Sequence, residues 1–136
     1  MRKSIIFKDV SEVNFNEIVN EIPFRILDYK KNEILFFEGD DCNSIGIVLD
    51  GEVEVNKGLT IGKKVNITKI KAGDMFAEAV VFSQYHKFPA TIEASSDSKV
   101  LFISRENIVK MCSKYPDFIE KFMGILSTKI SILNNK

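Results

Sequence analysis

The stretch of residues 44–58, SIGIVLDGEVEVNKG, decides the fold class of this chain of 136 residues. It places two short runs, IGIVL and EVEV, on either side of an Asp50-Gly51 pair. Apolar residues recur at alternate positions in both runs, as they do in strands that bury one face. An Asp-Gly pair favours the type I′ turn that joins two antiparallel strands. The stretch therefore predicts a β-hairpin.

The same alternating apolar pattern continues on both sides of this hairpin, over residues 25–104. Strand-like segments such as RILDYKKNEILFFEGD, KKVNITKIKAGD and PATIEASSDSKVLFIS are separated by Gly and Asp turns. Further turns are expected at three pairs: Gly39-Asp40, Lys57-Gly58 and Gly73-Asp74. About eight short strands with turns at this spacing are typical of an antiparallel sandwich or barrel.

Helices are predicted at both ends of this strand-rich region. Residues 11–22, SEVNFNEIVNEI, carry Val13, Phe15, Ile18, Val19 and Ile22 at near-helical spacing. Ser11 is a suitable N-cap for this helix, and Pro23 ends it. We therefore divide residues 1–136 into one domain with three parts: an N-terminal helix (1–23), a β roll (24–104) and C-terminal helices (105–136).

Two helices are expected in the C-terminal part. Ser104 is placed to cap the first, RENIVKMC, with Ile108, Val109 and Cys112 on its inner side. Pro116 and Asp117 then open a longer second helix, DFIEKFMGILSTKISILNNK, which Asp117 is placed to cap.

The last helix carries two apolar strips. A heptad seam has the spacing four-three-four-three, and a second strip runs beside it through Phe118, Phe122, Ile125 and Ile132. One strip is enough for a helix that packs on its own domain, so the second favours a homodimer; one wide buried face in a monomer is the alternative. The predicted dimer contacts are Ile119, Phe122, Met123, Leu126, Ile130 and Leu133.

Composition argues against several classes of function. The 19 basic residues balance the 19 acidic ones, so no basic face for nucleic acid is expected from this stretch itself. No apolar run reaches the roughly 18 residues that a membrane span needs, and the N-terminus lacks a signal peptide, so we expect a cytoplasmic protein. The two cysteines, Cys42 and Cys112, lack metal-ligand spacing, and we predict no metal site.

An enzymatic role is also not supported. The chain has a single histidine, His86, whereas a cupin-type metal centre in a β roll uses two or three. No GxSxG nucleophile elbow is present. The paired carboxylates at Asp40-Asp41 and Glu52/Glu54 fall at turn and strand-surface positions. We therefore predict a non-enzyme with no catalytic residues.

Three segments together resemble the effector domain of Crp/Fnr-type transcription regulators. IKAGDMFAEAVVF (70–82) is similar to the opening of the family's phosphate-binding cassette, G-D-x-F-G-E. Residues 34–55, ILFFEGDDCNSIGIVLDGEVEV, look like the family's first half, and residues 104–136 like its closing helix pair. The resemblance implies the cyclic nucleotide-binding fold: mainly β with flanking helices, an antiparallel double-stranded β-helix or jelly roll with a C-terminal dimerisation helix.

In this family a winged helix-turn-helix domain usually follows the dimerisation helix. The present sequence ends at Lys136, the end of that helix, so DNA would be bound only through a domain absent from this chain. A stand-alone sensor module is the alternative. A regulatory domain of the kinase or channel type is a further one, although the C-terminal heptads favour the bacterial dimer.

The resemblance also assigns roles within the cassette. In the family, helix N–H groups face a cyclic phosphate, a glutamate accepts a hydrogen bond from the ribose, and an arginine pairs with the phosphate. Glu78 stands at the ribose position, and Ala77 replaces the cassette glycine, a mild departure that adds one methyl group. The implied pocket residues are Gly73, Phe76, Ala77, Glu78, Phe82, Phe88, Pro89 and Ala90.

The phosphate-binding arginine is missing from its expected position. In the family it precedes a small residue by two positions; here Ala90 is that small residue, and Phe88 stands where the arginine would be. The chain's only arginines are Arg2, Arg25 and Arg105. Losing one partner of a buried charge pair costs about 2–5 kcal/mol, so we predict that the domain does not respond to cyclic AMP.

Three interpretations of this pocket remain at the sequence level. Phe76, Val81, Phe82 and Phe88 line a site for a different, less charged effector, or they fill the roll and nothing binds. In the third interpretation His86 ligates a haem, because histidine is a common axial ligand. No other cofactor is expected.

Overall fold

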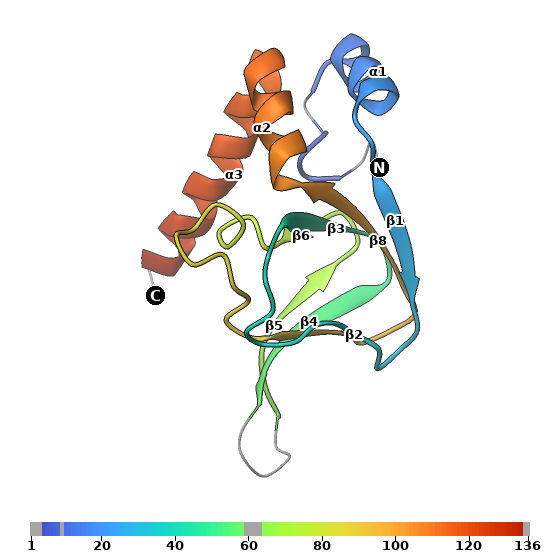
Figure 1. Ribbon diagram of the computed structural model, residues 1–136, viewed down its shortest axis with the longest axis vertical. Helices are drawn as coiled ribbons and strands as arrows, with labels where there is room; N and C mark the ends of the chain where they lie inside the picture. Colours follow the sequence, from blue (N-terminus) through green and yellow to red (C-terminus); the bar gives the residue numbers. More distant parts are fainter. Residues whose placement is uncertain (1–3, 9, 59–63, 135–136) are drawn as a thin grey trace.

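The computed structural model describes residues 4–8, 10–58 and 64–134, with the side chains of 58, 64–67 and 130–134 left aside. Two antiparallel sheets of four strands face each other as an open jelly roll (Figure 1). One sheet has the order β1 (Arg25–Tyr29), β8 (Ser98–Ser104), β3 (Ser44–Asp50), β6 (Met75–Phe76). The other has the order β2 (Ile34–Phe36), β7 (Thr91–Ala94), β4 (Glu52–Gly58), β5 (Lys64–Lys71). The mainly β fold class is confirmed.

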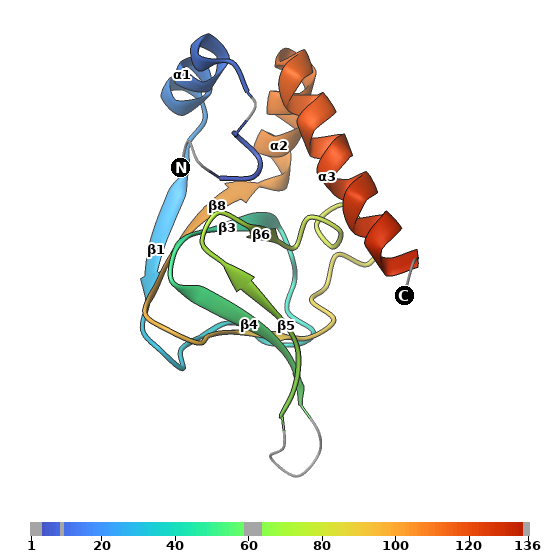
Figure 2. The ribbon, with the colours of Figure 1, turned by 180° about the vertical axis from the view of Figure 1, so that it is seen from behind.

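Three helices gather at one end of the roll, and the longest extends along its side (Figure 1). They are α1 (Glu12–Glu21), α2 (Arg105–Lys114) and α3 (Pro116–Asn134). The predicted caps are confirmed: Ser11 Oγ accepts from the Asn14 N–H, and Ser104 Oγ from the Asn107 N–H, each at 3.2 Å. Seen from behind in Figure 2, α3 lies beside the segment that follows β6. Among the described residues, no helix is long and apolar enough to cross a membrane.

The Asp50-Gly51 pair does not close a hairpin, so that prediction was wrong. β3 pairs with β8 and β6, whereas β4 belongs to the other sheet, so the pair turns the chain from one sheet into the next. Only Gly51 has a positive φ (+84°), although a type I′ turn needs two. A Cβ at Gly51 would lie 2.3 Å from the Asp97 carbonyl oxygen. The corner therefore requires glycine.

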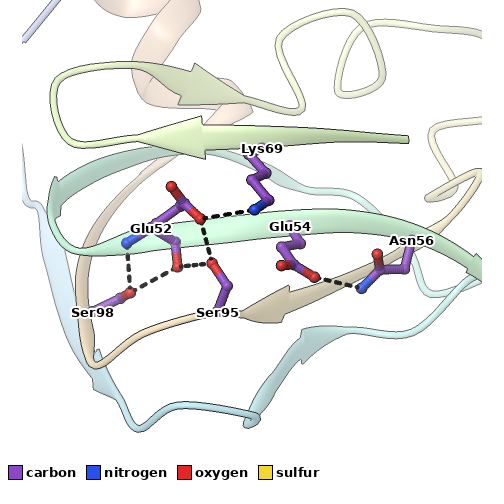
Figure 3. Close-up of polar contacts among 6 residues, drawn as sticks. All are labelled: Glu52, Glu54, Asn56, Lys69, Ser95 and Ser98. Atoms are coloured by element: carbon purple, nitrogen blue, oxygen red, sulfur yellow. Dashed lines mark hydrogen bonds and ion pairs between the residues drawn. The ribbon is translucent and has the colours of Figure 1, made fainter. Parts of the chain in front are cut away.

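Polar contacts hold this corner against the turn between β7 and β8 (Figure 3). The Glu52 N–H donates to Ser98 Oγ at 3.1 Å, and Ser95 Oγ donates to Glu52 Oε1 at 2.9 Å. Lys69 Nζ lies 4.0 Å from the same carboxylate oxygen. These contacts fix where the chain changes sheets. The true hairpin joins β4 to β5, pairing Gly58 with Lys64, so Lys57-Gly58 ends a strand and the tip lies outside the described residues.

Residues ahead of the first strand pack on the start of α3. The Phe7 and Phe118 ring centroids are 6.1 Å apart, and Asp117 accepts hydrogen bonds from the Ser11 N–H (3.1 Å) and Asn14 Nδ2 (2.8 Å). Desolvation raises the pKa of Asp117, but these bonds and those from first-turn amides outweigh it and hold the pKa below its usual value. Asp117 lies in the first turn of α3, not before it, and joins α3 to α1.

Val109 was predicted wrongly on the inner side of its helix, because it is 50% exposed, whereas Met111 is fully buried. In α1, Val13 of the near-helical apolar set is 68% exposed, whereas Ile18 is fully buried. Each helix therefore buries a narrower strip of side chains than its apolar pattern indicates, because the rest of the domain covers only one side of the helix.

The two apolar strips of α3 have different surroundings. Phe118, Phe122 and Ile125 are buried against the domain, while Ile119 and Leu126 are half-buried and Met123 is 50% exposed. Phe122, expected among the dimer contacts, therefore lies in the strip that faces its own core. The side chains of Ile130 and Leu133, the remaining two predicted contacts, lie outside the described ones.

Candidate ligand-binding site

A cavity of about 460 Å³ opens inside the roll between the second sheet and the segment around β6. Its walls include Val55 and Ile70 from β4 and β5, and Ile92 from β7. Six of the eight residues predicted for the pocket line it: Phe76, Ala77, Glu78, Phe88, Pro89 and Ala90. The family resemblance thus locates the part of the cavity wall formed by residues 76–78 and 88–90.

Gly73 and Phe82 do not line this cavity. Gly73 has a φ of +95° and forms the turn before β6, where its N–H donates to the Val48 carbonyl at 2.7 Å. Phe82 points toward the helix pair, with its ring edge-on to Phe122 at 6.2 Å and the Arg105 guanidinium 5.4 Å from its centroid. The turn at residues 77–82 changes the direction of the chain, so the Phe82 side chain points away from the cavity that Ala77 lines.

Ala77 adopts a left-handed backbone conformation, with φ at +71°. Its carbonyl accepts from the N–H groups of Val80 (3.1 Å) and Val81 (3.0 Å), and these bonds fix the turn. For a residue with a side chain this conformation costs roughly 1–2 kcal/mol. Alanine in place of the family's glycine therefore does more than add a methyl group, because residue 77 is held in a strained backbone conformation at the cavity wall.

Replacing Ala77 with glycine is expected to raise the free energy of unfolding by about 0.5–1 kcal/mol, because relief of strain exceeds the added chain entropy. Urea denaturation followed by circular dichroism measures the change. Ala79 lies in the same turn, is exposed and has no positive φ, so Ala79→Gly is the matched control and should lower stability slightly. Equal losses at both positions would contradict the strain argument.

An aromatic side chain, Phe88, lies in the cavity wall where the resemblance places an arginine. Phe88 is 3% exposed, and its ring stacks on Phe36 with centroids 4.3 Å apart and planes 17° from parallel. The backbone of Phe88 is anchored on both sides: its N–H donates to Asp40 (2.9 Å) and its carbonyl accepts from Gly39 (2.8 Å). The backbone contacts therefore hold the apolar ring of Phe88 in a fixed position in the cavity wall.

Lys129 of α3 is a site residue that the sequence interpretation missed. Its Nζ forms an ion pair and hydrogen bond with Glu78 Oε1, donates to the Met75 carbonyl at 3.2 Å, and lies 3.9 Å from Asp74 Oδ1. A signal was present: Phe118, Phe122, Ile125 and Lys129 continue one four-three-four strip. A lysine in the strip that packs on the domain needs a buried partner, and Glu78 is that partner.

Glu78 is the most buried charge in the site. Its side chain is 9% exposed, and one oxygen, Oε1, bonds Lys129. The other oxygen, Oε2, has no hydrogen-bond donor within the described part of the chain. Lys69, the second lysine in the lining, lies 4.0 Å from Glu52. The cavity thus has apolar walls and one polar end.

His86 and the two cysteines lie apart from this cavity. His86 is exposed, and its carbonyl accepts from the Cys42 N–H at 2.6 Å. Burial raises the pKa of both thiols, Cys42 and Cys112, above the usual thiol value. Among the described residues, no group of three or more His, Cys, Asp or Glu side chains could hold a metal ion. His86 is not among the residues that line the cavity.

A sequence match over more than half of the chain identifies the family of the protein. Residues 26–115 match the family described as "Cyclic nucleotide-binding domain", and this chain belongs to that family. The chain is 22% identical over 107 residues to the anaerobic regulatory protein of Bacillus subtilis, covering 79% of this chain and 45% of that protein.

Two further similarities agree with this assignment. The CRP-like cAMP-activated global transcriptional regulator of Mycobacterium tuberculosis is 22% identical over 111 residues, which cover 80% of this chain and 48% of that protein. The chain thus spans less than half the length of these relatives. A transcriptional regulator from Thermotoga maritima has the same fold, with a TM-score of 0.79 at 21% identity over 89% of this chain and 92% of that one.

Proposed function

We propose that this chain is the effector-sensing domain of a Crp/Fnr-type transcription regulator, and that its cavity binds a small molecule other than a cyclic nucleotide. The family membership and the names of the two similar regulators support the first part. Phe88, which lines the cavity and stacks on Phe36 behind it, carries the second part. DNA would be contacted by a helix-turn-helix domain elsewhere in the full protein, and the domain itself catalyses no reaction.

The charge of the ligand explains why the aromatic pair matters. A cyclic phosphate brings one negative charge into an apolar roll, and burying it without a cation is costly. Phe88 supplies no cation, and the Lys129 ammonium is already bonded to Glu78. Glu78 Oε1 is occupied by Lys129, which leaves only Oε2 as an acceptor for a ligand. An effector with an apolar body and no cyclic phosphate suits these walls better.

Titration of the protein with cyclic AMP and with cyclic GMP is expected to give dissociation constants in the millimolar range or weaker, because the loss of one buried charge partner weakens binding by about 2–5 kcal/mol. Isothermal calorimetry measures both constants. Circular dichroism before and after each titration checks that the protein stays folded. Micromolar binding of either nucleotide would refute the second part of the proposal.

We further propose that the exposed strip of α3 binds a second copy of the chain. A shallow apolar groove runs between α2 and α3, and its exposed members include Val109 and Met123. The seam residues Ile119, Met123 and Leu126 line this groove at heptad spacing. Two copies of one heptad strip can pack against each other about a twofold axis.

Substituting both Met123 and Leu126 with aspartate is expected to halve the particle mass measured by light scattering, because four carboxylates would meet in one apolar seam. Ser127 is exposed on the same helix and lies off the seam, so Ser127→Asp should leave the mass at that of a dimer. A wild-type protein with the mass of one chain, or an unchanged mass in the double variant, would exclude this dimer.

The ion pair between Lys129 and Glu78 supports a route from the cavity to the dimer helix. Glu78 lines the cavity, and Lys129 belongs to α3, the helix that carries the seam. A ligand that changes the position of Glu78 would also move the point at which α3 is held. Such a ligand shifts the arrangement of the two copies provided that it binds one arrangement more tightly than the other.

A further inference from the structure

The polar end of the cavity has an unbalanced charge. Two carboxylates, Asp74 and Glu78, lie close to one ammonium group, Lys129. The remaining lysine in the lining, Lys69, has its own carboxylate partner, Glu52, outside the cavity. The local formal charge at this end is therefore negative, although the family's usual ligand is an anion.

The hydrogen-bond inventory shows what this end of the cavity lacks. Lys129 donates two hydrogen bonds, to Glu78 Oε1 and to the Met75 carbonyl, and its Nζ lies 3.9 Å from Asp74 Oδ1. Asp74 Oδ1 accepts from the Met75 N–H at 2.7 Å. Glu78 Oε2, in contrast, is buried and has no donor among the described residues. A buried carboxylate oxygen without a donor is costly, so the missing component is a donor and not an acceptor.

We infer that the effector binds through an ammonium head group that donates to Glu78 Oε2, with its apolar body against the Phe88 ring. This inference rests on the proposed function of the cavity and specifies the ligand class. A charged donor on a carboxylate forms a stronger bond than a neutral one, and it cancels the excess negative charge. A carboxylate or phosphate head group would add a third negative charge at the same place and would leave Glu78 Oε2 without a donor.

Three probes with the same indole body and different head groups test the inference: tryptamine (ammonium), tryptophol (hydroxyl) and indoleacetate (carboxylate). Their dissociation constants are measured from amide chemical shifts in nuclear magnetic resonance titrations of the full chain. Tryptamine is expected to bind at least tenfold more tightly than indoleacetate, with tryptophol between them. The largest shifts are expected at residues 75–78.

Two variants locate the source of this preference. Glu78→Gln keeps the shape and removes the charge, so tryptamine should lose its advantage over indoleacetate. Glu106 is an exposed carboxylate of α2 outside the cavity lining, and Glu106→Gln should keep the full advantage. Circular dichroism verifies that both variants fold; the comparison of probes on the wild-type protein does not depend on either variant.

The outcomes separate this inference from the proposed function. If indoleacetate binds as tightly as tryptamine, or if the tryptamine advantage persists in Glu78→Gln, the ammonium inference is wrong while the cavity remains a ligand site. If none of the probes binds at millimolar concentration, both the inference and the proposed effector site are overturned. A tenfold preference that disappears only in Glu78→Gln supports both.

Discussion

Replacing Phe88 with arginine is expected to tighten the binding of cyclic AMP by about thirtyfold or more, the equivalent of restoring one partner of a buried charge pair. The backbone of residue 88 is already held by Gly39 and Asp40, so a new side chain starts from a fixed position. It would project into the cavity that Ala77 also lines. The guanidinium would supply the missing cation for the phosphate.

The measurement is calorimetric titration of cyclic AMP into Phe88→Arg, wild type and Phe88→Leu. The leucine variant also loses the ring stack on Phe36 but gains no charge, so it should bind no better than wild type. If arginine and leucine give equal affinities, Phe88 is not what prevents cyclic nucleotide binding, and the Glu78–Lys129 pair becomes the main obstacle.

Truncating Phe118 to alanine is expected to lower the free energy of unfolding by about 3–5 kcal/mol. The side chain is fully buried; its ring stacks on Phe122 with centroids 6.1 Å apart, and lies 6.1 Å from Phe7. The void left by the ring would lie between α3 and the N-terminal segment, and these two elements cannot easily move together to fill it. Chemical denaturation with urea measures the loss.

Val13→Ala is the control for this core substitution, because Val13 is 68% exposed. It should change the stability by no more than about 0.5 kcal/mol. A loss below about 1 kcal/mol for Phe118→Ala would mean that the contact between α3 and the N-terminal segment does not contribute to the folded core.

Much of the architecture follows from local sequence patterns. The strand positions, the two serine caps and the order of helices and strands depend on neighbours within a few residues, so alternation and capping signals predict them. The Asp50-Gly51 corner does not follow in this way. An Asp-Gly pair fits both a hairpin and a corner, and the decision depends on the distant contact between Gly51 and Asp97.

The candidate site also combines residues that the nearby sequence predicts with residues that depend on distant packing. The cassette residues Ala77, Glu78 and Phe88 lie close together in the sequence, so the family resemblance places them. Lys129 lies 51 residues from Glu78, and which face of α3 meets the cavity depends on how the helix packs. The prediction that Phe82 lines the cavity was wrong for a related reason. The turn that starts at Ala77 points the Phe82 side chain away from the cavity.

The N-terminal segment is bonded to the start of α3 through Ser11 and Asn14 on Asp117, and to the end of α2 through Glu21 on Lys114 at 2.5 Å. Anyone preparing a shortened protein that starts at β1 would leave the Asp117 carboxylate without these donors and the Phe118 ring uncovered. Trimming or tagging that end would therefore remove contacts that position the start of α3, so tests of the proposed effector response require protein that keeps residues 4–22.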